Sequence, residues 1–228
     1  MRNIIVRHPV GVTLIGGGKI RQKDLEEALS HAPALVAADG GAGAALKGGH
    51  MPAAIIGDMD SLPVADWPPG LLHRIGEQDS TDFDKALRSV SAPLVLGVGF
   101  LGRRVDHQLA NFNVLIRRTE QACILIGRHD VVFAAPASVS LDLPPASRVS
   151  LFPLRPVTGR SQGLHWPIDG LELAPDQRTG TSNRVADAPG GPVRLAFPAP
   201  GMLVILPRAA LGAALSGLAR AIPFAPAR

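Results

Sequence analysis

The chain has 228 residues, of which 46% are hydrophobic, and its formal net charge of +4 is carried mostly by arginines scattered along the sequence. It contains no run of the ~18 uninterrupted apolar residues that a membrane span requires, and its first residues lack the order of a signal sequence. We therefore expect a cytoplasmic protein without a membrane partner, and the scattered charge argues against nucleic acid as a partner.

Residues 12 to about 135 alternate short apolar runs with turns and helical stretches, which is the pattern of repeated βα units. The runs are continuously apolar rather than alternating, which is typical of buried strands in a parallel sheet. The predicted strands cover residues 12–16, 34–38, 53–57, 94–98 and 123–126, and the predicted helices cover residues 23–31, 42–47, 82–90 and 106–118.

Beyond about residue 136, prolines and glycines recur every few residues and the apolar runs are short, at 149–152, 193–197 and 202–206. This texture predicts an antiparallel β domain. The tail over 209–222 has helical composition, but Gly212 and Gly217 disfavour a helix, so the tail is left unassigned. The fold class is thus α/β, with a parallel-sheet domain over 1–135 and a smaller antiparallel domain over 136–228.

Aspartates follow the second and third predicted strands. Asp39 opens an Asp-Gly-Gly turn, and Asp58 and Asp60 lie in the segment 57–61. Ligands of open parallel sheets bind beyond the carboxyl ends of the strands. Carboxylates two residues apart on an extended segment project to one side, where their repulsion favours a cation, and hard oxygen ligands suit Mg²⁺. A polar turn in which Asp58 caps a helix is the structural alternative.

A third acidic segment opens the helix predicted at residue 82. Thr81 is placed to cap this helix, with Asp84 as the acid of a capping box. Acids in a first turn complement the helix dipole, which explains one of Asp82 and Asp84 without a function. Two acids beside Lys85 indicate a magnesium–phosphate site, with a carboxylate on the metal and the lysine on phosphate oxygens.

The fourth polar segment, 102–111, leads into the helix expected to start near Asp106. His107 and Asn111 stack one turn apart on this helix, with Arg104 ahead of them on the same side. This polar face is either exposed to solvent or directed at a ligand, and its convergence with the acidic loops favours the ligand. The apolar residues of the helix are expected to pack inward on another side: Leu109, Phe112 and Ile116.

Two glycine motifs match phosphate-binding patterns only in part. Residues 97–102 fit the dinucleotide-binding glycine fingerprint, but the acid expected ~20 residues on is missing, so a tight turn is expected. Residues 16–19 resemble a phosphate-binding loop in which Ile20 replaces the required Ser or Thr. An ordinary glycine turn is expected there, although its amides could approach phosphates closely.

Cys123 is expected to be a buried small hydrophobic residue without a disulfide.

The residues Asp58-Met59-Asp60-Ser61 after an apolar strand also resemble the nucleophile loop of haloacid-dehalogenase-like magnesium phosphatases. This is the enzymatic alternative. Those enzymes carry the loop on the first strand of the fold, whereas two strand–helix units precede it here. A non-catalytic α/β module that binds a nucleotide without turnover is the second alternative, because its binding site would look similar.

Taken together, the segments 39–41, 57–61, 81–85 and 104–111 resemble the thiamine pyrophosphokinase family in order and spacing. The resemblance continues at 163–168 and 181–183 and so spans most of the chain. One departure is Arg103, which stands where many relatives carry glycine. The resemblance implies an α/β nucleotide domain, a β-sandwich domain that binds thiamine, and a homodimer with active sites near the interface. It also implies Mg²⁺-dependent transfer of diphosphate from ATP to the thiamine hydroxyl. With this resemblance, the non-catalytic alternative becomes a sensor that binds a nucleotide or thiamine diphosphate without turnover.

The resemblance also implies roles for particular residues. Whether Asp39 or Asp106 orients the attacking hydroxyl stays open, and Trp166 is expected either to stack on thiamine or to anchor the core of the β domain. The implied residues are Asp58, Asp60 and Asp82 for Mg²⁺; Asp39, Lys85 and Arg104 for the triphosphate; Asp106, His107 and Asn111 to complete the pocket; and Trp166, Ser182 and Asn183 for thiamine.

Overall fold

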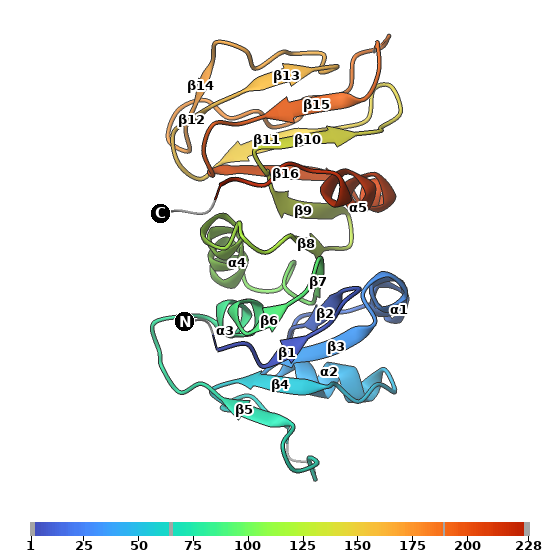
Figure 1. Cartoon of the computed structure of the whole chain (residues 1–228), viewed down its shortest axis with the longest axis vertical. Coiled ribbons are helices and arrows are strands. Elements are labelled where there is room, and N and C mark those ends of the chain that lie inside the picture. The colour runs from blue at the N-terminus through green and yellow to red at the C-terminus, as the bar shows by residue number, and fades with distance from the viewer. Residues whose placement is uncertain (1–2, 64–65, 189, 226–228) are drawn as a thin grey trace. The chain divides into compact units, whose positions relative to one another are not determined.

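The structure, a computed structural model, describes residues 3–63, 66–188 and 190–225 (Figure 1). The chain divides into two compact units, of which unit 1 comprises residues 1–114 and 125–127, and unit 2 comprises residues 115–124 and 128–228. The division passes through strand β8 (Cys123–Ile126). The domain boundary at residues 135 and 136 stays a prediction.

Unit 1 contains parallel strands built from continuously apolar segments, and the sheet to which they belong is mixed rather than parallel throughout. Its strands pair in the order β7-β2-β3-β4-β5, and every pair is parallel. All four residues of β2, β4 and β7 are buried, which explains why these strands lack an alternating pattern. The strands are β2 (Val12–Ile15), β3 (Ala34–Ala38), β4 (Ala54–Gly57), β5 (Leu72–Arg74) and β7 (Val95–Val98), and β1 (Val6–Arg7) and β6 (Val90–Ser91) form a separate parallel pair.

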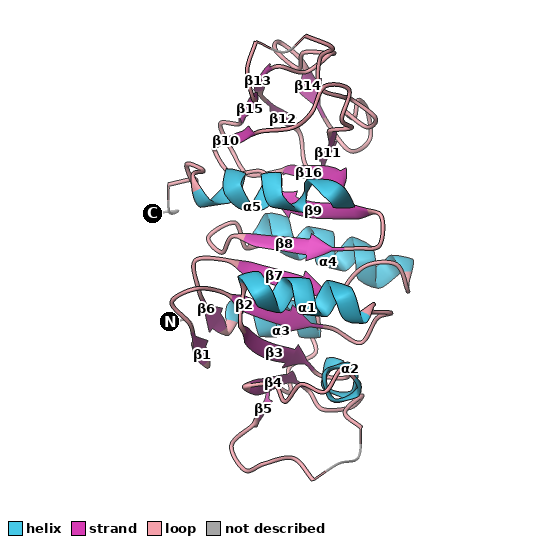
Figure 2. Ribbon diagram, turned by 90° about the vertical axis from the view of Figure 1, so that its right-hand side faces the viewer, coloured by secondary structure: helices cyan, strands magenta, loops and turns pink. Residues whose placement is uncertain are grey.

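The helices of unit 1 follow the strands in the predicted alternation. They are α1 (Gln22–His31), α2 (Gly41–Lys47), α3 (Asp82–Arg88) and the start of α4 (Val105–Arg117). Figures 1 and 2 show α1 on one face of the parallel strands and α3 on the other. Thr81 caps α3 as predicted, because its Oγ1 accepts a hydrogen bond from the Asp84 amide at 3.3 Å.

The orientation expected for α4 is partly wrong. Leu109 was expected to pack inward, but it is 58% exposed, and Val105 one turn earlier is 75% exposed. Asn111 is buried, but it lines the same hollow as Arg104 and His107, in agreement with the predicted polar face, and its Nδ2 donates to the carbonyl of Phe100 at 2.8 Å. This hydrogen bond turns the Asn111 side of the helix inward, so the buried stripe starts at Asn111 and leaves Leu109 outside.

Unit 2 is antiparallel, as its sequence predicts. Strands pair in the orders β11-β16-β9 and β10-β15-β13, with β12 and β14 as a separate pair. The unassigned tail forms the short helix η1 (Arg208–Ala210) and α5 (Leu211–Ala219). The strands are β9 (Asp130–Ala134), β10 (Ser138–Leu141), β11 (Ser150–Pro153), β12 (Val157–Thr158), β13 (Arg160–Gln162), β14 (Glu172–Leu173), β15 (Val193–Ala196) and β16 (Met202–Pro207).

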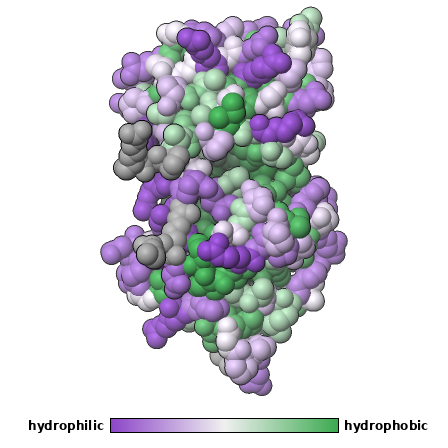
Figure 3. Space-filling view, viewed as in Figure 1, coloured by the Kyte–Doolittle hydropathy of each residue, from purple (hydrophilic) through white to green (hydrophobic). Residues whose placement is uncertain are grey.

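Strand pairing is therefore parallel in unit 1 and antiparallel in unit 2, and the protein has a mixed α/β fold. The prediction of a β-sandwich stays a prediction. Cys123 is buried and carries no disulfide, as expected. On the face drawn in Figure 3, hydrophilic and hydrophobic residues are interspersed. None of the helices within the described residues has the length and apolar character needed to cross a bilayer.

A substitution at Gly41, the first residue of α2, tests how tightly the start of this helix packs against β2. A Cβ at Gly41 would lie 2.0 Å from the carbonyl oxygen of Ile15, which is backbone and cannot move aside alone. We expect Gly41→Ala to lower the free energy of unfolding by about 3 kcal/mol or more. Gly212→Ala in α5 is the matched control, because a Cβ there meets nothing within 4 Å. Urea unfolding should show the control within about 1 kcal/mol of wild type; equal stabilities of the two variants would contradict the close contact.

Candidate active site

A cleft of about 560 Å³ opens in unit 1 beyond the carboxyl ends of the parallel strands. Because neighbouring parallel strands end at the same edge, the loops that follow β2, β3, β4 and β7 meet there. The starts of α3 and α4 complete the lining. The residues that line the cleft include Gly16, Gly17, Gly18, Asp39, Asp58, Ser61, Ser80, Asp82, Lys85, Gly99, Phe100, Arg103, Arg104, His107 and Asn111.

A cluster of carboxylates lies within this cleft. Asp39, Asp58 and Asp82 each present a carboxylate oxygen within 4.8 Å of the others. Asp60, which sequence reasoning included among the metal ligands, is not part of this group. The segment after β4 is not extended as expected, since Met59 adopts φ 70° and turns the chain between Asp58 and Asp60. The Asp60 amide donates to Asp58 Oδ1 at 3.3 Å.

Asp39 is almost fully buried, with 1% of its surface exposed, and its backbone adopts φ 41°. Its Oδ2 accepts a hydrogen bond from the Ser61 amide at 3.0 Å, while its buried Oδ1 has no partner among the described residues. Burial raises the pKa of Asp39 to about 6; the Ser61 amide opposes this shift, and the charge of Asp82 adds to it. An unsatisfied buried carboxylate oxygen fits a site that binds a cation.

Lys85 of α3 lies against the other two acids and is itself buried. Its Nζ is 3.3 Å from Asp58 Oδ2 and 3.4 Å from Asp82 Oδ1. Burial lowers the pKa of Lys85, but Asp82 and Asp58 outweigh burial and raise it, so the ammonium stays charged. One ammonium among three carboxylates leaves the cluster negative, which favours a bound divalent cation.

The pKa values of Asp58 and Asp82, the two acids beside Lys85, are shifted in opposite directions. Burial raises the pKa of Asp58, but the amide of Asp60 and the ammonium of Lys85 outweigh it and lower that pKa. The pKa of Asp82 is raised by burial, and Lys85 offsets this only in part. Asp58 is therefore the more readily ionised of the pair.

The loop that leads into α3 is held by Glu77, which sequence reasoning missed. Its carboxylate accepts hydrogen bonds from the Ser80 hydroxyl at 2.5 Å, from the Asp79 amide at 2.8 Å and from Arg88 Nη2 at 2.7 Å. Chiefly the Ser80 hydroxyl, together with Arg88, lowers the pKa of Glu77 to about 2. The available signal was an acid three residues before Ser80, a spacing typical of local turns.

At the start of α4, two adjacent arginines make different contacts. Arg104 bonds Asp106 through Nε at 3.1 Å and Nη2 at 2.5 Å, and this contact above all lowers the pKa of Asp106 to about 2. Arg103 instead donates from Nη1 to the carbonyl of Gly17 at 2.8 Å. Both arginines and His107 line the cleft, whereas Asp106 and Asp60 are not among the described residues that line it.

The predicted thiamine-side residues lie in unit 2. Trp166 is 56% exposed, so the alternative that it anchors a core is wrong. The ring packs edge-on against His165, with centroids 4.4 Å apart, and the Arg184 guanidinium lies 5.9 Å from its centroid. Asn183 is buried and binds both the amide and the carbonyl of Trp166, at 3.2 and 2.7 Å. Ser182 adopts φ 61° and donates its amide to Ser150 Oγ at 3.0 Å.

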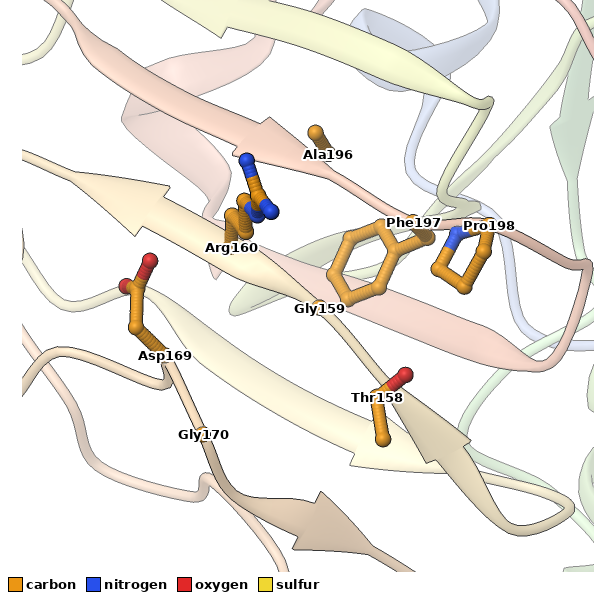
Figure 4. A pocket seen from close by; sticks show the side chains of 8 residues that line it. All are labelled: Thr158, Gly159, Arg160, Asp169, Gly170, Ala196, Phe197 and Pro198. Carbon is orange, nitrogen blue, oxygen red and sulfur yellow. The ribbon is translucent and has the colours of Figure 1, made fainter.

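Unit 2 has a hollow of its own, of about 530 Å³ (Figure 4). The rings of Phe197 and Pro198 lie beside each other there, with Arg160 and Asp169 to one side. The Asp169 carboxylate already has partners, because its Oδ2 accepts hydrogen bonds from the amide and the hydroxyl of Ser161 at 3.0 and 3.2 Å. Within the described chain, the carboxylates grouped closely enough to hold a metal lie in unit 1 and not here.

Comparisons with known proteins agree on one family. The family model described as thiamin pyrophosphokinase, catalytic domain, matches residues 25–126. Thiamine pyrophosphokinase 1 of Arabidopsis thaliana is 26% identical over 165 residues, which cover 63% of this chain and 62% of that protein. Thiamine pyrophosphokinase 1 of rice, Oryza sativa subsp. japonica, is 26% identical over 160 residues, which cover 60% of this chain and 61% of that protein. The chain thus matches less than two thirds of the length of these relatives.

Solved structures show the same fold. The thiamin pyrophosphokinase of Candida albicans has a TM-score of 0.69 at 17% identity, covering 87% of this chain and 89% of that one. The thiamin pyrophosphokinase of Geobacillus thermodenitrificans has a TM-score of 0.68 at 20% identity, and the match covers 86% of this chain and 96% of that one. The fold is therefore the mixed α/β fold of thiamin pyrophosphokinases. The family model, these relatives and these solved structures are thus all described as thiamine pyrophosphokinases.

The raised pKa of Asp39 predicts how the metal-free protein responds to pH. The Asp39 carboxyl binds its proton more tightly in the folded protein than in the unfolded chain. Protonated Asp39 therefore stabilises the fold fully below pH 3.8, and this stabilisation is lost as the pH rises through about 6. A shift of this size corresponds to about 3 kcal/mol at most. We expect the free energy of unfolding, measured in EDTA, to fall between pH 4 and 7, and Asp39→Asn to remove up to this amount of the fall. The raised pKa of Asp82 contributes a further part, which this variant keeps.

Asp106→Asn is the matched control for this measurement. The pKa of Asp106 is lowered to about 2 by Arg104, so its stabilisation is present above the unfolded value and is lost only as the pH falls below about 4. The control should therefore keep the wild-type slope between pH 4 and 7. An unchanged slope in Asp39→Asn would show that Asp39 is not the titrating group.

Proposed function

We propose that this protein is a thiamine pyrophosphokinase that uses Mg²⁺ and transfers diphosphate from ATP to the thiamine hydroxyl, giving thiamine diphosphate and AMP. The observation that carries the proposal is the carboxylate cluster around Lys85 in the unit 1 cleft. The cluster lies within the segment that matches the catalytic-domain model of the family. The names of the compared relatives supply the substrate, and neither the phosphatase nor the sensor alternative is supported by them.

The residues present fit a magnesium ion. All the donors are carboxylate oxygens, which Mg²⁺ prefers, and Asp39 contributes a buried oxygen without a hydrogen-bond partner. We propose Asp39, Asp58 and Asp82 as the residues that hold the ion, with Asp60 on the same loop as Asp58. Bound there, Mg²⁺ would neutralise phosphate charge and assist the departure of AMP.

The protein side chains would position the reactants. The thiamine hydroxyl oxygen attacks the β-phosphorus, the bond from that phosphorus to the α-phosphate oxygen breaks, and AMP leaves. Lys85 would place its ammonium against the phosphate oxygens as a point charge. Of the two acids that could orient the hydroxyl, Asp39 lines the cleft, whereas Asp106 is not among the lining residues and is bonded to Arg104. We therefore assign the orienting hydrogen bond to Asp39.

The remaining parts of the proposal rest on the resemblance and on the geometry of unit 2. Trp166 presents an exposed ring that could stack on the cationic thiamine, and Ser182 precedes the Asn183 that bonds the Trp166 backbone. Asn183 already uses its amide group to hold the backbone of Trp166, so we assign it a positioning role. We also propose a homodimer, as the resemblance implies, and the cytoplasm as the compartment.

The reaction products test the proposal directly. When purified protein is incubated with thiamine, ATP and Mg²⁺, we expect AMP and thiamine diphosphate to appear in equal amounts by mass spectrometry. ADP with thiamine monophosphate would show attack at the terminal phosphorus and a different kinase. Release of phosphate from a simple monoester without ATP would favour the phosphatase alternative.

Asp58→Asn is the control for this assay, because the variant loses one negative charge of the cluster with little change in shape. We expect its turnover to fall by roughly a thousandfold. Circular dichroism must show that the variant is folded. Wild-type turnover in this variant at saturating Mg²⁺ would contradict the assignment of the cluster.

Trp166→Ala tests the thiamine-side assignment. Because the ring is 56% exposed, its loss should leave the melting temperature nearly unchanged. The loss of stacking, about 1 to 2 kcal/mol, should raise the KM for thiamine by roughly five- to thirtyfold and leave the KM for ATP unchanged. Trp67→Ala is a second tryptophan substitution outside unit 2 and should leave the KM for thiamine at the wild-type value. An unchanged KM for thiamine in Trp166→Ala would remove Trp166 from the binding site.

A further inference from the structure

The cations that line the unit 1 cleft differ in how far their charge is already neutralised. Lys85 contacts the carboxylates of Asp58 and Asp82, and Arg104 makes a two-point contact with Asp106. Arg103 donates only to a neutral backbone carbonyl, that of Gly17. Among the lining cations in the described part of the chain, Arg103 is thus the one without a carboxylate partner.

The loop that carries Arg103 is fixed against the loop after β2. Gly99 adopts φ 79°, and a Cβ there would lie 2.6 Å from the carbonyl oxygen of Gly16. The Gly18 amide donates to the Gly99 carbonyl at 3.0 Å. β2 and β7 are paired neighbours, so these two glycine loops lie side by side at the same edge of the sheet (Figure 1). The exposed side chain of Arg103 connects the two loops, because it contacts the Gly17 carbonyl and both residues line the cleft.

We propose that Arg103 is a binding residue for the polyphosphate chain of the nucleotide, and that its contact with Gly17 holds the guanidinium ready for that ligand. This inference rests on the proposed function, because it names the ligand of the same cleft. A guanidinium carries five N–H donors, and the carbonyl of Gly17 occupies one of them. Hydrogen bonds from a guanidinium to an anionic oxygen are about twice as strong as neutral ones, so a phosphate oxygen should displace the carbonyl.

The geometry gives Arg103 a role that Arg104 does not share. For Arg104 to bind phosphate it must leave the carboxylate of Asp106, so its net gain is small. Arg103 gives up only a neutral acceptor. The planar guanidinium also suits two-point contact with phosphate oxygens, which the ammonium of a lysine cannot provide. Arg103 should therefore determine affinity for the polyphosphate more than the adjacent arginine does.

Calorimetric titration of the whole protein with inorganic tripolyphosphate, and separately with ATP and Mg²⁺, tests this inference. We expect Arg103→Ala to weaken both affinities by about tenfold and Arg103→Lys by about threefold. Arg160→Ala is the matched control, since it removes an exposed arginine from the unit 2 hollow (Figure 4) and should bind as wild type does. The KM for ATP should rise in Arg103→Ala, with the KM for thiamine unchanged.

Three results would overturn the inference. Wild-type affinity in Arg103→Ala with a lowered melting temperature would mean that Arg103 only ties two loops together. Weakened binding in Arg160→Ala and not in Arg103→Ala would place the anion in unit 2. Absence of tripolyphosphate and ATP binding by the wild type would remove both the inference and the proposed function. Weakened binding in Arg103→Ala without thiamine turnover by the wild type would support the inference and contradict the proposed function alone.

Discussion

The contact of the buried Lys85 ammonium with the carboxylates of Asp58 and Asp82 is the interaction on which the rest of the cleft depends. Removing one partner from a buried ion pair leaves an uncompensated charge, which is strongly destabilising. Asp58 comes from the loop after β4, whereas Asp82 is the first residue of α3 and Lys85 follows on the same helix. The contact therefore fixes this helix start against the end of the parallel sheet.

The surrounding structure keeps this helix start in place. Thr81 caps α3, and the carboxylate of Glu77 holds the preceding loop through hydrogen bonds from the Ser80 hydroxyl and from Arg88. On the other side, Asp39 is held at φ 41° by the turn after β3, with one oxygen bonded to the Ser61 amide. This cluster costs stability, because three carboxylates lie close together and the single ammonium of Lys85 pairs with only two of them. Strain and like-charge repulsion of this kind are typical of sites whose ligand supplies the compensating charge.

The parallel strands and their helices could be predicted because each is a continuous apolar run or an apolar stripe long enough to show a period. β5 and β13 could not, since each has three residues and includes exposed polar side chains. The acids of the cleft could be predicted because the ends of parallel strands meet at one edge. The turn at Met59 and the inward position of Asn111 could not, since a backbone dihedral and a distant carbonyl determine them.

The central claim is that Asp39, Asp58 and Asp82 form one divalent-cation site. The most direct test is crystallographic: the protein is crystallised with Mn²⁺ in place of Mg²⁺, and the metal is located from its anomalous scattering. The account predicts one Mn²⁺ ion at coordination distance from the oxygens of these three carboxylates, with Asp39 Oδ1 among them. An ion bound at other residues of the chain, with these carboxylates contacting only Lys85 and water, would contradict it.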